Sequence, residues 1–249
     1  MIGPGAQRRL TDRLAGVACV DVWLIEVSDD GPLGLRAAEA LLTAPERLEI
    51  EHRYRGESRA QSIIARAALR RLVAAYAGGD PRTIALGRDH RGRPLVLGSA
   101  ARISVSIAHS GAFVACAAAR QEIGIDIEPY DRPEADEYLA GRVCVPAERH
   151  LLELIRPEKR REALVRLWVR KEALSKAFGQ GLGLEPATVD VCKDTPVLSG
   201  EPQKGWSVRD LVAPSGYAAA VAARGRRTRV RAQLYPAPSG RFPSVKTPR

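Results

Sequence analysis

Lysine is scarce in this sequence, because only six of its 39 basic residues are lysines and none occurs before Lys159. Aromatic residues are also few, at 5%, and no apolar run approaches the roughly 20 residues that a membrane-spanning helix requires. Residues 1–16 lack the apolar stretch of a secretory signal. We therefore expect a cytoplasmic protein without a membrane partner.

Cysteine is limited to four widely separated positions, Cys19, Cys116, Cys144 and Cys192. There is no CxxC pair and no close histidine partner, which argues against a structural zinc site and against a disulfide framework. Three of the four lie in apolar runs and are expected to be buried free thiols. The sequence also lacks a P-loop and a GxGxxG turn between strand and helix, which excludes the commonest nucleotide-binding folds.

Acidic residues are outnumbered, because the chain has 39 basic and 29 acidic residues and a formal net charge of +10. This excess favours an anionic partner, which could be nucleic acid, a membrane surface, an acidic protein or a phosphorylated cofactor. A nucleic-acid module would interleave clustered basic residues with stacking aromatics. Here the arginines are spread along the chain, although residues 224–231 form one basic cluster. We therefore expect no nucleic-acid partner.

Hydrophobic periodicity and turn residues predict alternating strands and helices. The capping-box pattern at Thr43–Glu46 opens one helix, and a second helix at residues 58–77 ends at Gly78. We expect a solvated face on this second helix to carry Arg59, Arg66, Arg70 and Arg71. Further helices are predicted within residues 142–155, where Val145-Pro146 can begin the helix, and at residues 157–177. Strands are predicted at residues 20–27, 83–86, 102–108, 113–119, 124–128, 188–192, 206–211, 217–223 and 230–235.

The predicted elements follow the same loose order twice, with a strand, helices and further strands on either side of residue 121. Short connections suggest that residues 102–128 form an antiparallel meander with a turn at His109. The sequence therefore predicts an α/β (α+β) fold of two similar subdomains, residues 1–121 and residues 122–235. Residues 236–249 contain four prolines and no acidic residue, which predicts a disordered tail.

The stretch GIDIE at residues 124–128 places two carboxylates within an apolar strand pattern. Side chains alternate along a strand, so Asp126 and Glu128 share one face. Like charges this close repel and raise each other's pKa unless a cation lies between them. Taken alone, a D-x-E pattern is more typical of a solvent-facing strand. Its neighbours in the sequence decide between these interpretations.

The helix predicted at residues 157–177 carries Leu164, Trp168, Glu172 and Lys176 along one side at i, i+4 spacing. A glutamate that follows a tryptophan on a stripe of this kind is unusual. Lys176 stands one turn after Glu172, which is typical either of a surface ion pair or of a cation placed at a site. The scarcity of lysine favours the second interpretation.

Three blocks together resemble the Sfp-type 4′-phosphopantetheinyl transferases: GIDIE, the later Pro146-Ala147-Glu148, and WVRKEALSKAFGQGL at residues 168–182. The resemblance extends upstream through residues 45–47, 65–66, 92–94 and 107–111, and covers about residues 40–225. It implies transfer of the phosphopantetheine arm from coenzyme A to a serine of an acyl, peptidyl or aryl carrier protein, with Mg²⁺ or Mn²⁺ as cofactor. It also implies two subdomains related by a pseudo-twofold axis, in a monomer with its active site in the cleft between them.

The resemblance assigns roles to individual positions. The implied metal ligands are Asp126, Glu128 and Glu172, and the implied catalytic residues are Glu172, Lys176 and Glu148, with Glu148 and Glu172 as rival bases. Contacts to coenzyme A are implied for Arg47, Arg66, Arg88, Arg93, His109 and Lys171, of which Lys171 could instead pack beside Trp168.

The chain departs from the family pattern at three places. Ala108 replaces a hydroxyl residue before the histidine, Ile50 stands where relatives often have a basic residue, and residues 143–145 replace an aromatic-rich stretch. These departures affect the expected binding of the coenzyme A nucleotide and the docking of the carrier protein. They do not affect the metal ligands that the resemblance implies. The basic surface would attract the acidic recognition helix of a carrier protein. A Mg²⁺-dependent hydrolase that acts on nucleotides is the alternative enzyme class.

Overall fold

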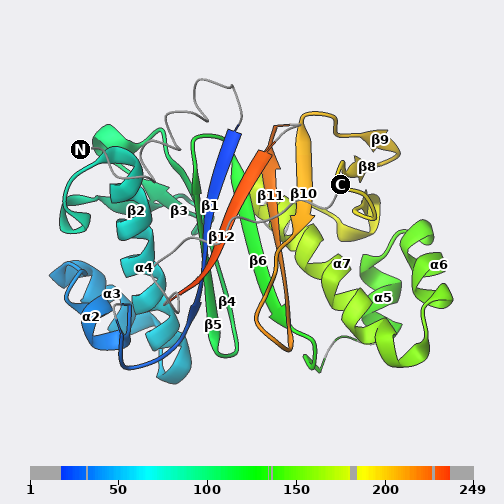
Figure 1. Cartoon of the computed structure of the whole chain (residues 1–249), viewed down its shortest axis with the longest axis horizontal. Coiled ribbons are helices and arrows are strands. Elements are labelled where there is room, and N and C mark those ends of the chain that lie inside the picture. Colours follow the sequence, from blue (N-terminus) through cyan, green and yellow to red (C-terminus); the bar gives the residue numbers. More distant parts are fainter. Residues whose placement is uncertain are drawn as a thin grey trace.

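The computed structural model describes residues 18–31, 33–133, 135, 137–179, 184–225 and 228–235. Strands form the centre of the molecule and helices cover both flanks (Figure 1), which confirms the mixed α/β class. The predicted tail at residues 236–249 lies outside the described residues, as do Gly181 and Gly183. Among the described residues, no helix has both the length and the apolar character needed to cross a membrane.

The two halves of the chain have the same topology. In the first half, β1 (Ala18–Glu26) is followed by α2 (Leu35–Glu39), α3 (Ala44–Arg53), α4 (Gly56–Ala77), the hairpin β2 (Leu86–Arg88) and β3 (Pro94–Val96), and then β4 (Ser104–Ser110) and β5 (Phe113–Ala119). In the second half, β6 (Ile123–Pro129) is followed by α5 (Glu137–Val143), α6 (Pro146–Leu154), α7 (Pro157–Phe178), the short strands β7 (Val189–Asp190), β8 (Val197–Leu198) and β9 (Glu201–Pro202), and then β10 (Trp206–Asp210) and β11 (Tyr217–Arg224).

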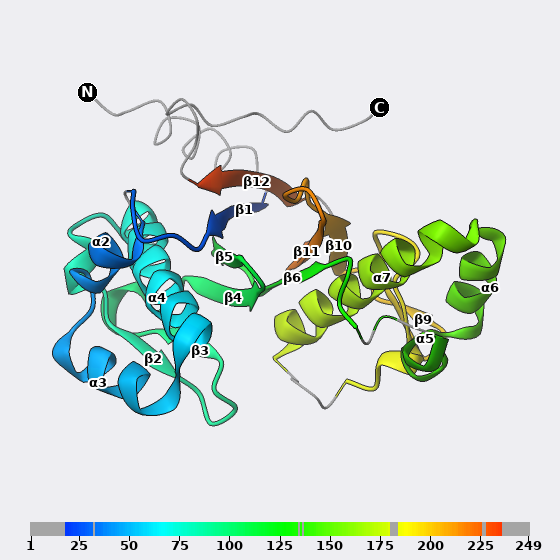
Figure 2. The ribbon, with the colours of Figure 1, turned by 90° about the horizontal axis from the view of Figure 1, so that it is seen from below.

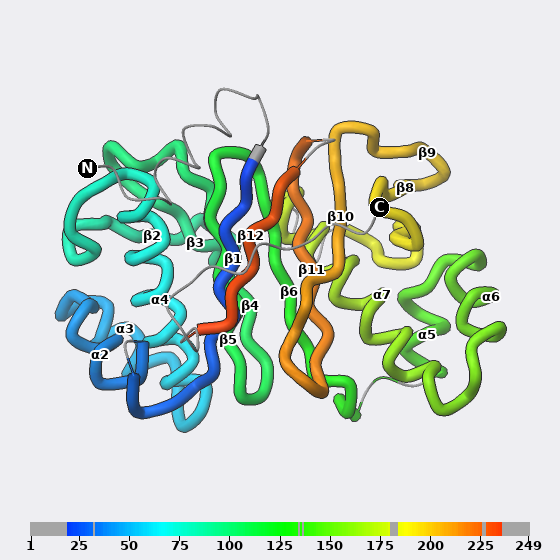
Figure 3. Tube along the Cα trace, viewed as in Figure 1, coloured from blue at the N-terminus to red at the C-terminus, as the bar shows by residue number. Residues whose placement is uncertain are grey.

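The matching strands pair in the same order, β1-β5-β4 in the first half and β6-β11-β10 in the second. The helices α4 and α7 are each 22 residues long and pack on the strands of their own half. The last strand, β12 (Thr228–Tyr235), leaves this pattern and pairs in parallel with β1. Figure 3 shows β12 running beside β1, so the final strand extends the sheet of the first half.

Strand composition explains how the two sheets meet. Ile125 and Ile127 of β6 are buried in a core cluster that also contains Val22 and Leu24 of β1. Alanines from β5 and β11 complete this cluster, and their small side chains let the two sheets approach closely. Two further clusters lie beneath α4 and α7. Because Asp126 alternates with these isoleucines, its side chain points away from the shared core.

Several predicted elements are confirmed. The capping box at Thr43 and Glu46 is present, and β5 covers the predicted range. The long helices α4 and α7 lie within about two residues of their predicted limits, which is the usual uncertainty of helix ends. The short strands β8 and β9 were not predicted, because two-residue strands carry no readable periodicity.

Other predictions are wrong for identifiable reasons. The predicted strand at residues 83–86 is a 3-10 turn followed by β2, since the Asp80 side chain caps the turn. The predicted meander ends after two strands, because β6 pairs with β11 and contacts β4 through the Ser106 hydroxyl, which accepts a hydrogen bond from the Ile125 N–H. His109 lies within β4, and the turn is at Gly111. The helix expected within residues 142–155 begins at Pro146 as predicted, and Arg142 and Val143 instead end α5.

The predicted solvated face of α4 is also partly wrong. Arg66 and Arg70 are buried, because each has a carboxylate partner on α3. The Arg70 guanidinium lies 2.8 Å from Glu46, and the Arg66 guanidinium lies 2.6 Å from Glu49. These ion pairs fasten α3 to α4.

Candidate active site between the two halves

A cleft of about 480 Å³ opens between the two halves of the molecule. Its walls come from α4, the β2–β3 hairpin and β4 on one side and from β6 and α7 on the other. In Figure 2, α4 and α7 lie on either side of β4 and β6, and β12 lies above these strands at the top of the view. The cleft brings together eight residues singled out in the sequence, namely Arg66, Arg88, Arg93, His109, Asp126, Glu128, Glu172 and Lys176.

A close approach of β6 to α7 positions the two acidic elements. A Cβ atom on Gly124 would lie 2.0 Å from the carbonyl oxygen of Ala173 and 2.5 Å from the backbone nitrogen of Ala177. Only glycine therefore fits at the start of the GIDIE stretch. Because the helix lies directly on the strand, the Lys176 Nζ reaches to 2.7 Å from the Asp126 Oδ1.

The carboxylates of this cleft lie in contrasting surroundings. The Asp126 Oδ2 is buried and has no hydrogen-bond partner among the described residues. The Glu128 Oε2 accepts a hydrogen bond from the Ser110 hydroxyl at 2.6 Å, and its Oε1 lies 3.1 Å from the Arg132 guanidinium. Glu172 is half-buried on α7. Oxygen donors of this kind suit a hard divalent cation such as Mg²⁺ or Mn²⁺.

Burial disfavours ionisation of the Asp126 and Glu172 carboxyl groups. It raises the pKa of Asp126 to about 6, although the neighbouring Lys176 ammonium opposes the rise. Burial also raises the pKa of Glu172, the negative charge of Glu128 adds to the effect, and Lys176 and Arg132 oppose it. A buried, orphaned carboxylate oxygen and raised pKa values are features that a bound cation would relieve.

Basic residues line the opposite wall. Arg66 on α4 and Arg88 on β2 both approach Glu49, at 2.6 and 3.7 Å. Burial disfavours the ionised form of Glu49, but these arginines outweigh it and the pKa of Glu49 is lowered. Partial removal from water and the charge of Lys176 lower the pKa of His109, so this imidazole is neutral near pH 7.

Three residues implied by the resemblance lie outside the cleft. The side chain of Glu148 is 0% exposed and lies 2.7 Å from the Lys171 Nζ, whose side chain is 2% exposed. Glu148 also accepts hydrogen bonds from the N–H groups of Val145 and Val191. Lys171 donates to backbone carbonyls instead of reaching a phosphate or lying free beside Trp168. Arg47 donates to the carbonyl oxygen of Leu42 at 2.6 Å and does not line the cleft either.

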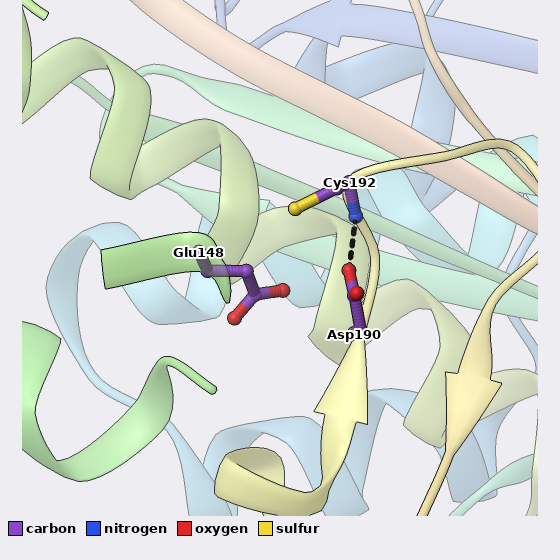
Figure 4. Close-up of side chains that lie close together, drawn as sticks. All are labelled: Glu148, Asp190 and Cys192. Atoms are coloured by element: carbon purple, nitrogen blue, oxygen red, sulfur yellow. Dashed lines mark hydrogen bonds between the residues drawn. The ribbon is translucent and has the colours of Figure 1, made fainter. Parts of the chain in front are cut away.

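Glu148 is also close to Asp190 and Cys192 (Figure 4). One ligand atom from each of these three residues lies within 4.8 Å of the others. However, Lys171 already balances the charge of Glu148, and burial together with Asp190 raises the pKa of the Cys192 thiol to about 12. This group therefore holds a protonated thiol near pH 7. Among the described residues no cysteine forms a disulfide, and Cys116 and Cys144 are buried.

Sequence reasoning missed three residues around the cleft. Glu49 contacts two of the predicted arginines, Arg132 contacts Glu128, and Arg91 donates a hydrogen bond to the Gly179 carbonyl oxygen across the cleft at 3.0 Å. Arg132 could have been noted because it follows Glu128 by four residues. Neither Glu49 nor Arg91 lies in a motif, since their contacts depend on the tertiary fold.

Comparison with known proteins gives matches along most of the chain. A family model described as "4'-phosphopantetheinyl transferase superfamily" matches residues 122–222, and one described as "4'-phosphopantetheinyl transferase, N-terminal" matches residues 32–121. The 4'-phosphopantetheinyl transferase HetI of Nostoc sp. is 31% identical over 212 residues, which cover 83% of this chain and 88% of that protein. A 4'-phosphopantetheinyl transferase of Bacillus subtilis is 30% identical over 145 residues, 58% of this chain and 63% of that protein.

Solved structures also match part of the chain. The holo-[acyl-carrier-protein] synthase of Thermotoga maritima is 25% identical, with a TM-score of 0.34, and the match covers 43% of this chain and 64% of that one. Because the relative from Nostoc is 31% identical over most of its length, and the two family matches together extend from residue 32 to residue 222, this chain belongs to the 4′-phosphopantetheinyl transferase family of enzymes.

Proposed function

We propose that the cleft between the two halves is where this transferase moves 4′-phosphopantetheine from coenzyme A to a serine of an apo carrier protein. The observation that carries this proposal is the convergence of Asp126, Glu128, Glu172 and Lys176 opposite a wall of basic residues. Carboxylates suit a divalent cation, and arginines suit phosphate groups. The charge pattern therefore matches a substrate that contains a pyrophosphate.

A metal site is proposed at Asp126, Glu128 and Glu172. The buried Asp126 Oδ2, to which no described residue donates a hydrogen bond, and the all-oxygen donor set fit Mg²⁺ or Mn²⁺. When held there, the cation would neutralise charge that develops on the pyrophosphate. Phosphate binding is assigned to residues 1–121 and the metal and catalytic residues to residues 122–235, with the protein acting as a monomer.

Basic side chains hold the phosphates of coenzyme A in this proposal. Arg66, Arg88 and Arg93 supply guanidinium groups from α4 and the β2–β3 hairpin. Each guanidinium group can donate two parallel hydrogen bonds to the oxygens of one phosphate. The neutral His109 supplies one hydrogen-bond donor from the end of β4. Glu49 keeps Arg66 and Arg88 together until the substrate arrives.

Proton transfer is assigned to α7. Glu172 accepts the proton of the carrier serine, because its carboxylate lines the cleft on the same helix as Lys176. Glu148 is enclosed by the core and has no route to the serine, so its proposed catalytic role is dropped. The serine oxygen then attacks the β-phosphorus, and the bond to adenosine 3′,5′-bisphosphate breaks. Lys176 stabilises the departing phosphate and can donate a proton to it.

The test is intact-protein mass spectrometry of apo acyl, peptidyl and aryl carrier proteins incubated with the enzyme, coenzyme A and Mg²⁺. A mass gain of one phosphopantetheine, lost in EDTA and lost in the D126A variant, is expected. The D29A variant is the matched control, because Asp29 is exposed and does not line the cleft. Cleavage of coenzyme A without modification of any carrier would instead indicate a hydrolase, and full transfer by D126A would refute the metal assignment.

A further inference from the structure

The Glu128 carboxylate is held from two sides. Its Oε2 accepts a hydrogen bond from Ser110 at the end of β4, and its Oε1 lies 3.1 Å from the Arg132 guanidinium. The two partners come from different halves of the molecule. Glu128 therefore has little freedom to rotate, unlike an ordinary glutamate at the end of a strand.

Arg132 is placed by a turn that follows β6. The N–H of Tyr130 donates to the carbonyl oxygen of Gly216 at 2.8 Å, which ties the start of this turn to the segment before β11. The Arg132 guanidinium then lies 5.3 Å from the centre of the Trp168 ring on α7. Because Trp168 stands one helical turn before Glu172, Arg132 connects the two elements that carry the cleft carboxylates.

Arg132 acts on the carboxylates without facing the substrate space. Its side chain is only 18% exposed, and it is not among the residues that line the cleft. Trp168, in contrast, does line the cleft. A guanidinium that stacks on an indole and pairs with a carboxylate keeps its charge and its planar geometry, which a lysine ammonium cannot reproduce.

We propose that Arg132 is a positioning residue, which from its place over Trp168 fixes the Glu128 carboxylate against Ser110 so that it is ready to hold a divalent cation. This inference rests on the metal site of the proposed function. Arg132 also offsets repulsion among Asp126, Glu128 and Glu172, a role that Lys176 shares from the other end of the group. Since Arg132 does not line the cleft, its proposed action is through Glu128 and not on coenzyme A.

The test compares R132Q and R132K with R166Q. Arg166 is an exposed arginine of the same region, and its guanidinium also lies 5.3 Å from an aromatic ring, that of Tyr130. It therefore controls for the loss of an arginine–aromatic contact away from the carboxylates. Binding of Mn²⁺ is measured on each free protein by electron paramagnetic resonance, and the KM for coenzyme A is measured at saturating metal. Thermal unfolding identifies any variant that fails to fold.

Loss of a residue that orients a metal ligand typically weakens metal binding about tenfold or more, so R132Q is expected to lower Mn²⁺ affinity by about tenfold. R132K should fall between R132Q and wild type, R166Q should match wild type, and the KM for coenzyme A should change by less than about twofold. Unchanged Mn²⁺ affinity in R132Q overturns the proposal, and if R132Q does not fold, unchanged affinity in R132K does so. Failure of the wild-type protein to bind Mn²⁺ would instead refute the metal site itself.

Discussion

The Nζ of Lys176 on α7 lies 2.7 Å from the Oδ1 of Asp126 on β6. The pair joins an ammonium to the most deeply buried carboxylate of the cleft, while the second oxygen of that carboxylate has no hydrogen-bond partner within the part of the chain that the structure describes. The strand and the helix that contribute the pair are in contact along their lengths, because Gly124 leaves room for the helix backbone. This geometry yields the following predictions.

Replacing Lys176 by methionine should lower kcat about 100-fold, because general acid assistance and stabilisation of the leaving phosphate are both lost. The KM for the carrier protein should change little. Lys159 offers a matched control on the same helix, since it forms an exposed ion pair with Glu162, and K159M should retain wild-type kcat. Steady-state kinetics with a fixed carrier would measure both, and an unchanged kcat in K176M would rule out this role.

The D126N variant should be more stable than wild type near neutral pH without metal. Burial raises the pKa of Asp126 from its ordinary value of 3.8 to about 6, so folding favours the protonated acid. The protonated Asp126 carboxyl makes its full contribution to the free energy of unfolding below about pH 4, and this contribution is lost as the pH rises through about 6. Asparagine does not ionise, so the D126N variant does not lose this stability as the pH rises. Thermal unfolding in EDTA across this pH range should show the wild-type curve falling relative to the D126N curve, whereas parallel curves would contradict the assignment.

Added Mg²⁺ should reverse the order of stability and make the wild-type protein more stable than the D126N variant. The proposed metal site exists only in the folded protein, so Mg²⁺ should raise the unfolding temperature of the wild-type protein but not that of D126N. The variant should also lose carrier modification. Equal stabilisation of both proteins by Mg²⁺ would place the cation elsewhere.

Replacing Gly124 by alanine should cost both stability and activity, because the new Cβ would collide with the backbone of Ala173 and Ala177. Helix α7 must then move away from β6 and carry Lys176 with it. Gly141, inside α5, has no atom within 4 Å of an added Cβ, so G141A should stabilise the protein by about 0.5–1 kcal/mol. Urea unfolding and transfer assays on both variants test this contrast, and similar behaviour of the two would refute it.

The Glu148–Lys171 pair should matter for folding rather than for chemistry. Replacing Glu148 by glutamine leaves the buried Lys171 ammonium without its counter-charge, which typically costs about 3–5 kcal/mol. The E148Q/K171M double variant should recover part of this loss, because no buried charge remains. Urea unfolding measures the effect. A fully stable E148Q variant that cannot transfer phosphopantetheine would return Glu148 to the catalytic residues.

Local patterns were enough to predict the acidic core of the candidate site. Strand alternation put Asp126 and Glu128 on one face, and helical spacing put Glu172 and Lys176 on one side of α7. Both rules operate within a single element, so they do not depend on the rest of the fold. That these residues act as ligands and catalysts stays a prediction, as does the boundary between residues 121 and 122.

Tertiary partners could not be predicted in the same way. Arg66 and Arg70 were expected in water, but their carboxylate partners on α3 allow them to be buried. Glu148 was placed in the site because of its position in a motif, whereas the partner that encloses it comes from α7. The pairing of β6 with β11 was also missed, because β11 follows β6 by about 90 residues and the sequence of a strand does not indicate which strand it pairs with.

The parallel pairing of β12 with β1 connects the two halves of the molecule a second time. It runs from Ala18 opposite Thr228 to Ile25 opposite Tyr235, so the two halves are joined once by the peptide chain after β5 and again by a ladder of hydrogen bonds. A fragment that stops at residue 121 would leave one edge of β1 bare and open to aggregation. A protease cut in the connection between β5 and β6 should therefore leave a nicked protein whose pieces stay associated, whereas removal of β12 alone should weaken the association of its halves.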